Sequence, residues 1–271
     1  MISWRILMKR LRWQVRTTVW TYPAIYLPVA GRLHPGVVLA PDSELVIDGF
    51  TRSAVSFAVI AFQMAQPRPI RVAHTLHAPA HFIQGAKRGL PCLATIRDPK
   101  EVALSAVVRE PHLALSQALR SYARFYEAIK PLGARVLVAD FADVTKDFGA
   151  VIQRLNERFG TRFAEFEHTP ENVEECFNLI NARGRRGPHS KPLRELQSGL
   201  IGIYDYRRLV NDKNPGVSAD SPTVQELRVG RPSEERGALK NFHASELQDV
   251  RLRGLLARAD DVYRTLTVAT A

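Results

Sequence analysis

The sequence predicts an α/β protein in which helices cover both faces of a mostly parallel sheet, a three-layer α/β/α arrangement. Short apolar runs alternate along the chain with longer segments that have helical periodicity. The short runs are apolar at nearly every position, as expected of strands that are buried on both faces of a parallel sheet. A chain of 271 residues is long enough to bury the core that this fold needs.

Each predicted strand is followed by residues that break a strand, and the four strands cover 44–47, 70–74, 91–96 and 134–140. The predicted helices cover 57–64, 80–88, 113–129, 146–159 and 247–266, and two more begin near Pro99 and Ser233. Proline suits a first helical turn and serine is a good N-cap. We interpret Asp143 as a cap before Lys146.

The chain divides into a basic N-terminal segment, 1–40, and a single predicted domain, 41–271. Residues 1–40 hold six Lys or Arg and no acid, interleaved with Trp and aliphatic residues. This pattern fits an amphipathic segment on an anionic membrane surface. The alternatives are a basic helix packed on the edge of the domain and a signal peptide, which two prolines disfavour. Residues 181–233 show little periodicity, which indicates disorder or a lid over a binding site.

The formal net charge is +11 and the isoelectric point is near 10.0, which favours acidic partners. Nucleic acid, anionic lipid, sulfated glycan and a nucleotide cofactor all fit that description. Only two cysteines occur, Cys92 and Cys176, so the sequence has no disulfide framework and no C-x-x-C metal motif. We expect a cytoplasmic protein, in contact with a membrane if residues 1–40 lie on one.

Residues 44–65 predict an anion-binding turn, because a strand leads through small polar residues into a helix. Backbone N–H groups and the positive end of the helix then meet at one point. Gly49, Ala54 and Ser56 are spaced as in G-x-x-x-x-G-K-[ST], but Val55 stands in place of the lysine that a nucleoside triphosphatase needs. The cation, Arg52, lies inside the turn instead. An ordinary turn with a solvated arginine is the alternative.

Three stretches together resemble the PAPS-dependent sulfotransferases of bacterial type, where PAPS is 3′-phosphoadenylyl sulfate. Residues 50–57, Phe-Thr-Arg-Ser-Ala-Val-Ser-Phe, are similar to that family's Y-P-K-S-G-T-T-W. Arg97-Asp98-Pro99 with Ser105 matches its R-x-P-x-x-x-x-x-S, and Leu76-His77-Ala78-Pro79 is similar to its T-H-x-P. The resemblance covers about residues 44–160 and implies a P-loop NTPase-like fold.

The resemblance also implies a role for each matching residue. Arg97 and Ser105 would bind the 3′-phosphate of PAPS, and His77 would be the catalytic base, with His74 as the alternative. The 5′-phosphosulfate would lie on the turn, with Arg52 also acting in catalysis; the residues of this cofactor-binding turn are Arg52, Ser53, Ala54, Val55, Ser56 and Phe57. An aromatic ring in the place of Phe57 can stack on the adenine, although helical spacing equally favours a core residue.

Three departures from the family pattern stand out. Ala54 replaces a glycine, Arg52 replaces a lysine, and the C-terminal R-K-G-x-x-G is not recognisable, with 183–186 or 228–231 as substitutes. His74, His77 and His81 have the spacing of a metal-binding helix face, but Pro79 interrupts such a helix, so no metal is expected.

We therefore expect a sulfotransferase with PAPS as co-substrate and a hydroxyl acceptor, which is a carbohydrate, a glycolipid or a small alcohol. The segment 181–233 would form the acceptor site or its lid. A P-loop-like kinase and a protein that binds an anionic ligand or nucleic acid are the alternatives. No sequence signature of a nucleic-acid-binding motif supports specific recognition of nucleic acid.

Overall fold

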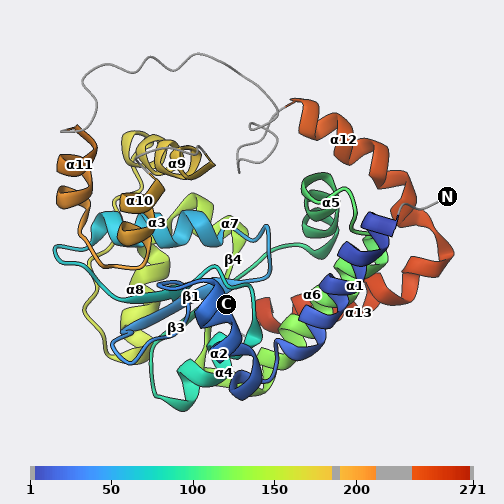
Figure 1. Cartoon of the computed structure of the whole chain (residues 1–271), viewed down its shortest axis with the longest axis horizontal. Coiled ribbons are helices and arrows are strands. Elements are labelled where there is room, and N and C mark those ends of the chain that lie inside the picture. Colours follow the sequence, from blue (N-terminus) through green and yellow to red (C-terminus); the bar gives the residue numbers. More distant parts are fainter. Residues whose placement is uncertain (1–3, 185–189, 212–233, 269–271) are drawn as a thin grey trace.

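The computed structural model describes residues 4–184, 190–211 and 234–268, and it is an α/β protein. Its four-stranded, all-parallel sheet has the strand order β2-β1-β3-β4 and is flanked by helices (Figure 1). The strands are β1 (Leu45–Gly49), β2 (Val72–His74), β3 (Cys92–Ile96) and β4 (Leu137–Asp140). The predicted α/β class with a parallel sheet is confirmed, and each strand lies within a few residues of its expected place.

The helices that precede β4 are α1 (Trp4–Val19), α2 (Pro23–Leu33), α3 (Val55–Ala65), α4 (Pro79–Lys87), α5 (Pro99–Arg109), α6 (Leu115–Ile129) and the 3₁₀ helix η1 (Lys130–Arg135). Those that follow it are α7 (Phe141–Lys146), α8 (Phe148–Phe159), α9 (Pro170–Gly184), α10 (Ser190–Gln197), α11 (Ile203–Asn211), α12 (Glu234–Ala244), the 3₁₀ helix η3 (Ser245–Gln248) and α13 (Val250–Val268). The expected helices after each strand are therefore present.

Residues 190–211 are largely helical, so the expectation of disorder is wrong for them, whereas a lid stays a prediction. Their large buried apolar side chains are few, Leu193 and Leu196 in α10 and Ile203 and Tyr206 in α11, which explains why the sequence shows little periodicity there. Residues 185–189 and 212–233, with the substitute motif at 228–231, lie outside the described residues. Asp143 is not a cap: it bonds Arg154, while α7 and α8 begin after capping carboxylates at 140 and 147.

Helices cover both faces of the sheet because successive strand residues point to opposite sides. Leu45 and Ile47 of β1 belong to the core under α3, α8, α9 and α10, whereas Val46 belongs to the core under α4, α6 and α13. Figure 1 shows α3, α9 and α10 on one side of the sheet and α4 with α2 on the other.

The carboxyl ends of β1 and β3 lie side by side at the point where the chain path reverses. From β1 the chain passes through α3 to β2 on one side, and from β3 it passes through α5 and α6 to β4 on the other. Connections that leave neighbouring strands in opposite directions open a crevice, which is where ligands bind in such sheets. The turns after β1 and β3 flank this crevice.

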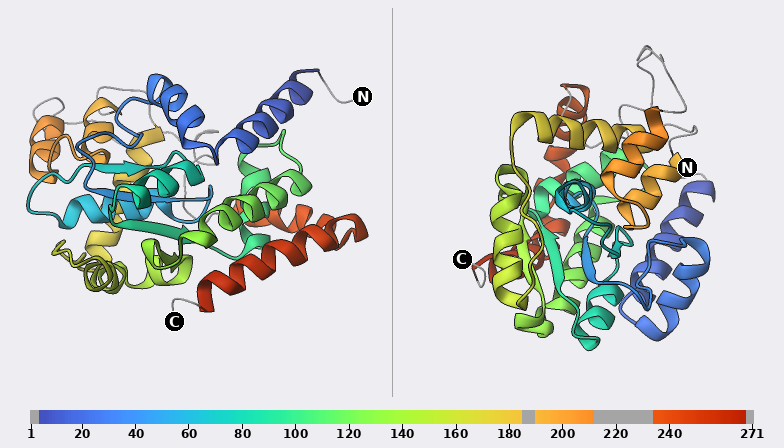
Figure 2. Two further views of the ribbon diagram at one scale, coloured as in Figure 1. Left: turned by 90° about the horizontal axis from the view of Figure 1, so that it is seen from below. Right: turned by 90° about the vertical axis from the view of Figure 1, so that its left-hand side faces the viewer.

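The N-terminal helices α1 and α2 line one side of the molecule. Helix α13 lies against α6 on the side of α6 that faces away from α1 (Figure 2). Trp20, between α1 and α2, is fully buried; its ring packs edge-on against Phe50 and Phe125, and its carbonyl accepts a hydrogen bond from Ala80 N. No helix within the described ranges is long and apolar enough to cross a membrane.

Candidate anion-binding site

The turn between β1 and α3 has the backbone shape of an anion site. Arg52 and Ala54 are left-handed, with φ of 74° and 68°, while Ser53 between them is not. Left-handed residues in a tight turn can direct neighbouring N–H groups toward one point, and here α3 begins directly after the turn, so the N-terminal N–H groups of the helix lie beside it. Ala54 thus has the conformation that favours glycine, the residue that the family pattern has here.

Side chains brace this turn from inside. The Ser53 hydroxyl donates to Phe50 O at 2.5 Å and lies 3.0 Å from Thr95 Oγ1. The Tyr126 hydroxyl donates to Thr95 O at 2.7 Å and accepts from Phe50 N at 3.2 Å. A methyl group on Gly49 would collide with the carbonyl and hydroxyl oxygens of Thr95. The Ser53 hydroxyl is therefore already used in hydrogen bonds within the turn. Of the polar groups of Ser53, only the main-chain N–H remains to bind an anion.

The two predicted cofactor motifs meet at Arg52. Its Nε donates to the buried hydroxyl of Ser105 at 2.8 Å, and its carbonyl accepts from a guanidinium nitrogen of Arg97 at 3.5 Å. These residues are 53 and 45 positions away in sequence. The geometry places two guanidinium groups and a serine around one turn, a donor set suited to phosphate.

Arg97 has an anionic partner within the chain. Its guanidinium donates to Glu101 at 3.1 Å and lies 4.0 Å from the centre of the Phe141 ring, and Lys240 of α12 donates to the same Glu101 oxygen at 2.7 Å. The hydrogen bond from Lys240, helped by the charges of Lys240 and Arg97, outweighs burial and lowers the pKa of Glu101. Burial lowers the pKa of Arg97, which nevertheless stays charged. Asp98 caps α5 rather than pairing with Arg97.

His77 is fixed against the end of β1. Its main-chain N–H points at both carboxylate oxygens of Asp48, at 3.1 and 3.0 Å, and its Nδ1 lies 2.8 Å from Gly49 O. Since a carbonyl can only accept, we assign the Nδ1–H tautomer, which makes Nε2 the basic nitrogen. Its φ of 53° is also left-handed. The side chain is 26% exposed, so the ring is reachable from solvent.

Asp48 is the buried anchor beneath His77. It is fully buried and also accepts from Gly49 N at 2.9 Å and from His81 Nδ1 at 2.9 Å. Burial alone would raise the pKa of Asp48, but the His81 hydrogen bond, the charges of His81 and His77, and the Gly49 N–H outweigh it and hold the pKa below its ordinary value.

The other two histidines fit the site less well. His74 ends β2, is only 2% exposed and lies with its Nδ1 2.6 Å from Thr75 Oγ1; His81 is fully buried, and its Nε2 has no hydrogen-bond partner. The geometry therefore favours His77 over His74 as a base. Across the residues that the structure describes, no three His, Cys, Asp or Glu side chains form a group that could hold a metal ion.

Phe57 points into the core instead of toward the turn. Its ring is 4% exposed and packs against Phe148, Phe166 and Phe177, so the core alternative is favoured over adenine stacking. Val55 is likewise buried, whereas Ser56 is partly exposed in the first turn of α3.

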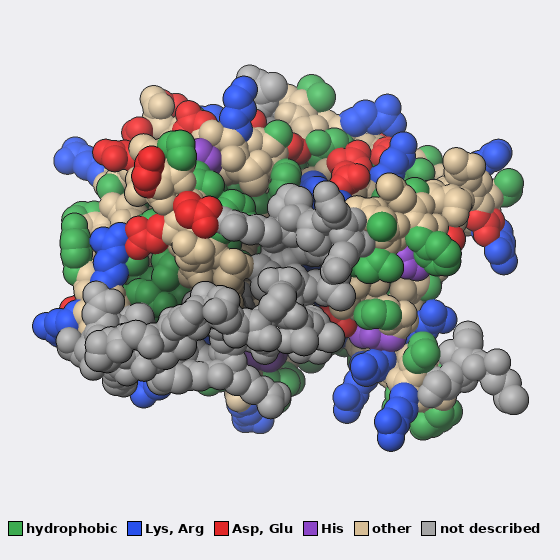
Figure 3. Space-filling model, turned by 90° about the horizontal axis from the view of Figure 1, so that it is seen from above, with side chains coloured by type: hydrophobic (Ala, Val, Ile, Leu, Met, Phe, Trp, Pro, Cys, Tyr) green, Lys and Arg blue, Asp and Glu red, His purple; other side chains and the backbone are tan. Residues whose placement is uncertain are grey.

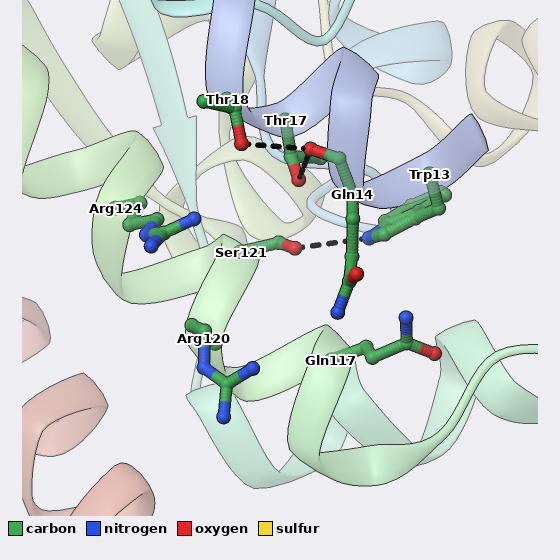
Figure 4. A pocket seen from close by; sticks show the side chains of 8 residues that line it. All are labelled: Trp13, Gln14, Thr17, Thr18, Gln117, Arg120, Ser121 and Arg124. Atoms are coloured by element: carbon green, nitrogen blue, oxygen red, sulfur yellow. Dashed lines mark hydrogen bonds between the residues drawn. The ribbon is translucent and has the colours of Figure 1, made fainter. Parts of the chain in front are cut away.

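A pocket of about 260 Å³ lies elsewhere, between α1 and α6 (Figure 4). Eight polar or aromatic side chains line it: Trp13, Gln14, Thr17, Thr18, Gln117, Arg120, Ser121 and Arg124. None of the predicted site residues belongs to it.

A scan against known protein families finds none that matches, and neither the curated proteins nor the solved structures give a match. The evidence for the candidate site is therefore the geometry of the described residues. Sequence reasoning missed Asp48, Thr95, Glu101 and Lys240. A carboxylate inside the apolar run 45–49 was a signal for Asp48, but nothing in the sequence near Lys240 links it to Glu101.

Proposed function

We propose that this protein is a PAPS-dependent sulfotransferase with a P-loop NTPase-like fold, which moves a sulfuryl group to a hydroxyl of a carbohydrate, glycolipid or small alcohol. The observation that carries the proposal is the contact between the two predicted cofactor motifs at Arg52. Two motifs that the resemblance assigns to opposite ends of one nucleotide contact each other through Arg52, Ser105 and Arg97.

Strained backbone conformations support the same location for the site. All four non-glycine residues with left-handed backbone in the described part of the chain lie in the turns after β1 and β2; they are Arg52, Ala54, Thr75 and His77. Such conformations cost on the order of 1–3 kcal/mol each and cluster at functional sites. Both turns are at the carboxyl edge of the sheet, where ligands bind in α/β proteins.

The reaction requires stabilisation of a leaving phosphate and removal of one proton. The acceptor oxygen bonds to sulfur while the bond from sulfur to the 5′-phosphate oxygen breaks, and adenosine 3′,5′-bisphosphate (PAP) leaves with that electron pair. The N–H groups of the turn and the charge of Arg52 would stabilise the phosphate oxygen. The acceptor proton would pass to Nε2 of His77, whose opposite nitrogen is held by Gly49 O.

At the 3′-phosphate, Arg97 would supply a charge-assisted contact from an orientation that Phe141 and Glu101 fix. Lys240 donates to the same Glu101 oxygen and would add a second cation near this end of the nucleotide. We assign Ser105 the role of orienting Arg52, because its hydroxyl already accepts from that guanidinium.

The kinase alternative is weaker, because Val55 is buried where a kinase of this type needs a charged lysine at the phosphates. Nucleic-acid binding rests on net charge alone and does not account for a strained turn with a braced interior.

Thermal unfolding without divalent metal tests the cofactor. PAP should raise the melting temperature, because a ligand that binds only the native state stabilises it. Adenosine 5′-monophosphate, which lacks the 3′-phosphate, should give a smaller shift. A shift with ATP–Mg²⁺ and none with PAP would contradict the proposal.

The matched variants are Arg52→Ala and Arg251→Ala. Arg251 is exposed on α13 and pairs with Asp249, far along the chain from the turn. Arg52→Ala should abolish the PAP shift and Arg251→Ala should retain it. Transfer of labelled sulfate from PAPS to an acceptor then tests the reaction itself.

A further inference from the structure

The N-terminal helices expose an unusual amount of apolar surface. Of the fifteen exposed large apolar side chains in the described residues, nine lie on α1, α2 and the residues between them: Trp4, Leu7, Met8, Leu11, Val15, Tyr22, Ile25, Val29 and Leu33. Isolated exposed apolar side chains are ordinary, but a contiguous set marks an interaction surface. We call these nine residues the apolar stripe.

The stripe follows one face of each helix. On α1, Leu7 and Met8 are adjacent and the other steps from Trp4 to Val15 are three or four residues; from Tyr22, just before α2, to Leu33 every step is three or four, a spacing that places side chains on the same side of a helix. The other side of α1 contacts the domain, where Trp13 Nε1 donates to Ser121 Oγ at 2.9 Å and Thr17 is buried. The stripe is therefore the outer surface of a helix that is already packed, and no part of the described chain covers it.

Positive charge accompanies the stripe. Arg5, Lys9 and Arg12 are exposed on α1, no acid precedes Asp42, and none of these three bases has an acidic partner among the described residues. Figure 3 shows Lys and Arg side chains gathered over α1, beside the N-terminal end. An apolar face flanked by bases is complementary to a layer of anionic headgroups over hydrocarbon.

The pocket between α1 and α6 borders the same face. Thr18 continues the spacing of the stripe between Val15 and Tyr22, and it also lines the pocket with Arg120 and Arg124 of α6 (Figure 4). Neither arginine has a carboxylate within ion-pair distance in the parts of the chain that are described. The pocket thus offers two unpaired guanidinium groups and hydroxyls to an anionic group of headgroup size.

We propose that the apolar stripe docks this protein on an anionic lipid surface, with a headgroup phosphate in the pocket at Arg120 and Arg124. Nucleic acid would use the bases but leave the aliphatic stripe in water, whereas a bilayer uses both. Trp20, between α1 and α2, packs on Phe50 at the start of the candidate turn, so the two helices that carry the stripe are anchored to the residue that opens this turn. The proposal does not depend on sulfotransferase activity.

Co-sedimentation of the full chain with vesicles tests docking, without nucleotide present. The vesicles are phosphatidylcholine alone and phosphatidylcholine mixed with phosphatidylglycerol. We expect binding to the mixed vesicles only. Replacing Arg5, Lys9 and Arg12 by Gln should weaken it roughly fivefold per base. The matched control replaces Lys130, Arg135 and Arg253 by Gln, which removes equal charge elsewhere.

The apolar contribution has its own pair of variants. Leu7→Glu with Leu11→Glu should abolish binding, while Tyr204→Glu with Phe242→Glu, at residues exposed by 74% and 71% on α11 and α12, should not. Arg120→Gln with Arg124→Gln should reduce the preference for phosphatidylglycerol. Equal binding by the Leu7/Leu11 variant and its control would overturn the proposal. So would retention of the protein by heparin without binding to vesicles, which would identify a polyanion surface instead.

Discussion

The candidate anion-binding turn and the N-terminal helices depart in opposite directions from the usual rule that polar side chains are exposed and apolar side chains are buried. At the turn, polar groups are buried: Asp48 and Ser53 have no exposed surface. On α1 and α2, large apolar groups are exposed, as with Trp4 at 70%. Buried polar groups must find hydrogen bonds within the chain, so the turn is rigidly connected. Exposed apolar groups need nothing from the chain, so the stripe is free to meet a partner.

Loss of the proposed base should give the largest effect. His77→Ala should lower sulfate transfer by about 10²–10⁴-fold while PAP affinity stays near that of the wild type, because the base acts on the acceptor. Single-turnover transfer and calorimetric PAP binding measure the two quantities. His243→Ala, on α12, is the control. Full turnover in the His77 variant would make His74 the next candidate.

Asp48→Asn should disrupt the turn that follows β1, because the amide of Asn cannot accept hydrogen bonds from all the donors that point at this carboxylate. Removing one partner of a buried charged network costs about 3–5 kcal/mol of unfolding free energy. The native pKa of Asp48 is lowered. Its ionised form therefore contributes stability that is complete above the ordinary pKa of about 4 and is lost as pH falls through the native pKa.

Urea unfolding at pH values between about 6 and 3 checks this dependence. The wild type should lose unfolding free energy more steeply than Asp48→Asn below about pH 4. Parallel acid profiles would show that Asp48 is not the group that titrates.

Arg97→Ala should weaken PAP binding before it affects the chemical step. A hydrogen bond to a charged group contributes about 1.5–3 kcal/mol, which is roughly 10–150-fold in Kd. Calorimetry with PAP and with adenosine 5′-monophosphate should show the loss for PAP alone. Equal losses for both nucleotides would place Arg97 at the other end of the nucleotide.

Ala54→Gly should stabilise the protein by on the order of 0.5–1 kcal/mol, because glycine adopts the left-handed conformation without the strain of a methyl group. Ala257→Gly, in the exposed part of right-handed α13, should instead destabilise it by about as much. Thermal unfolding of the two variants gives shifts of opposite sign if the turn has the described shape.

The smallest effect should come from the stripe. Leu7→Glu with Leu11→Glu should change the unfolding free energy by less than about 0.5 kcal/mol, because both side chains already face water. A loss of several kcal/mol in denaturant unfolding would mean that these leucines are structural. The contrast with Asp48→Asn is the sharpest form of the comparison between the two regions.

The sequence predicts local features of this protein better than it predicts contacts. Strand ends, Pro99 as a helix start and the turn at Arg52 all follow from short-range patterns. The bond from Lys240 to Glu101 joins residues 139 positions apart, and no short-range pattern encodes such a contact. For Phe57, the motif indicated a ligand contact, but packing against three other rings decided its place.

The position of the tryptophans has an optical consequence. All three in the chain, Trp4, Trp13 and Trp20, lie within its first twenty residues. Trp4 is on the stripe and Trp20 touches Phe50 at the start of the anion-binding turn. The tryptophan fluorescence of this protein is therefore emitted entirely from α1 and the turn after it, with Trp4 facing solvent and Trp20 beside the candidate site. With Trp4 or Trp20 replaced by Phe, the emission that remains separates events at the outer surface from events at the turn.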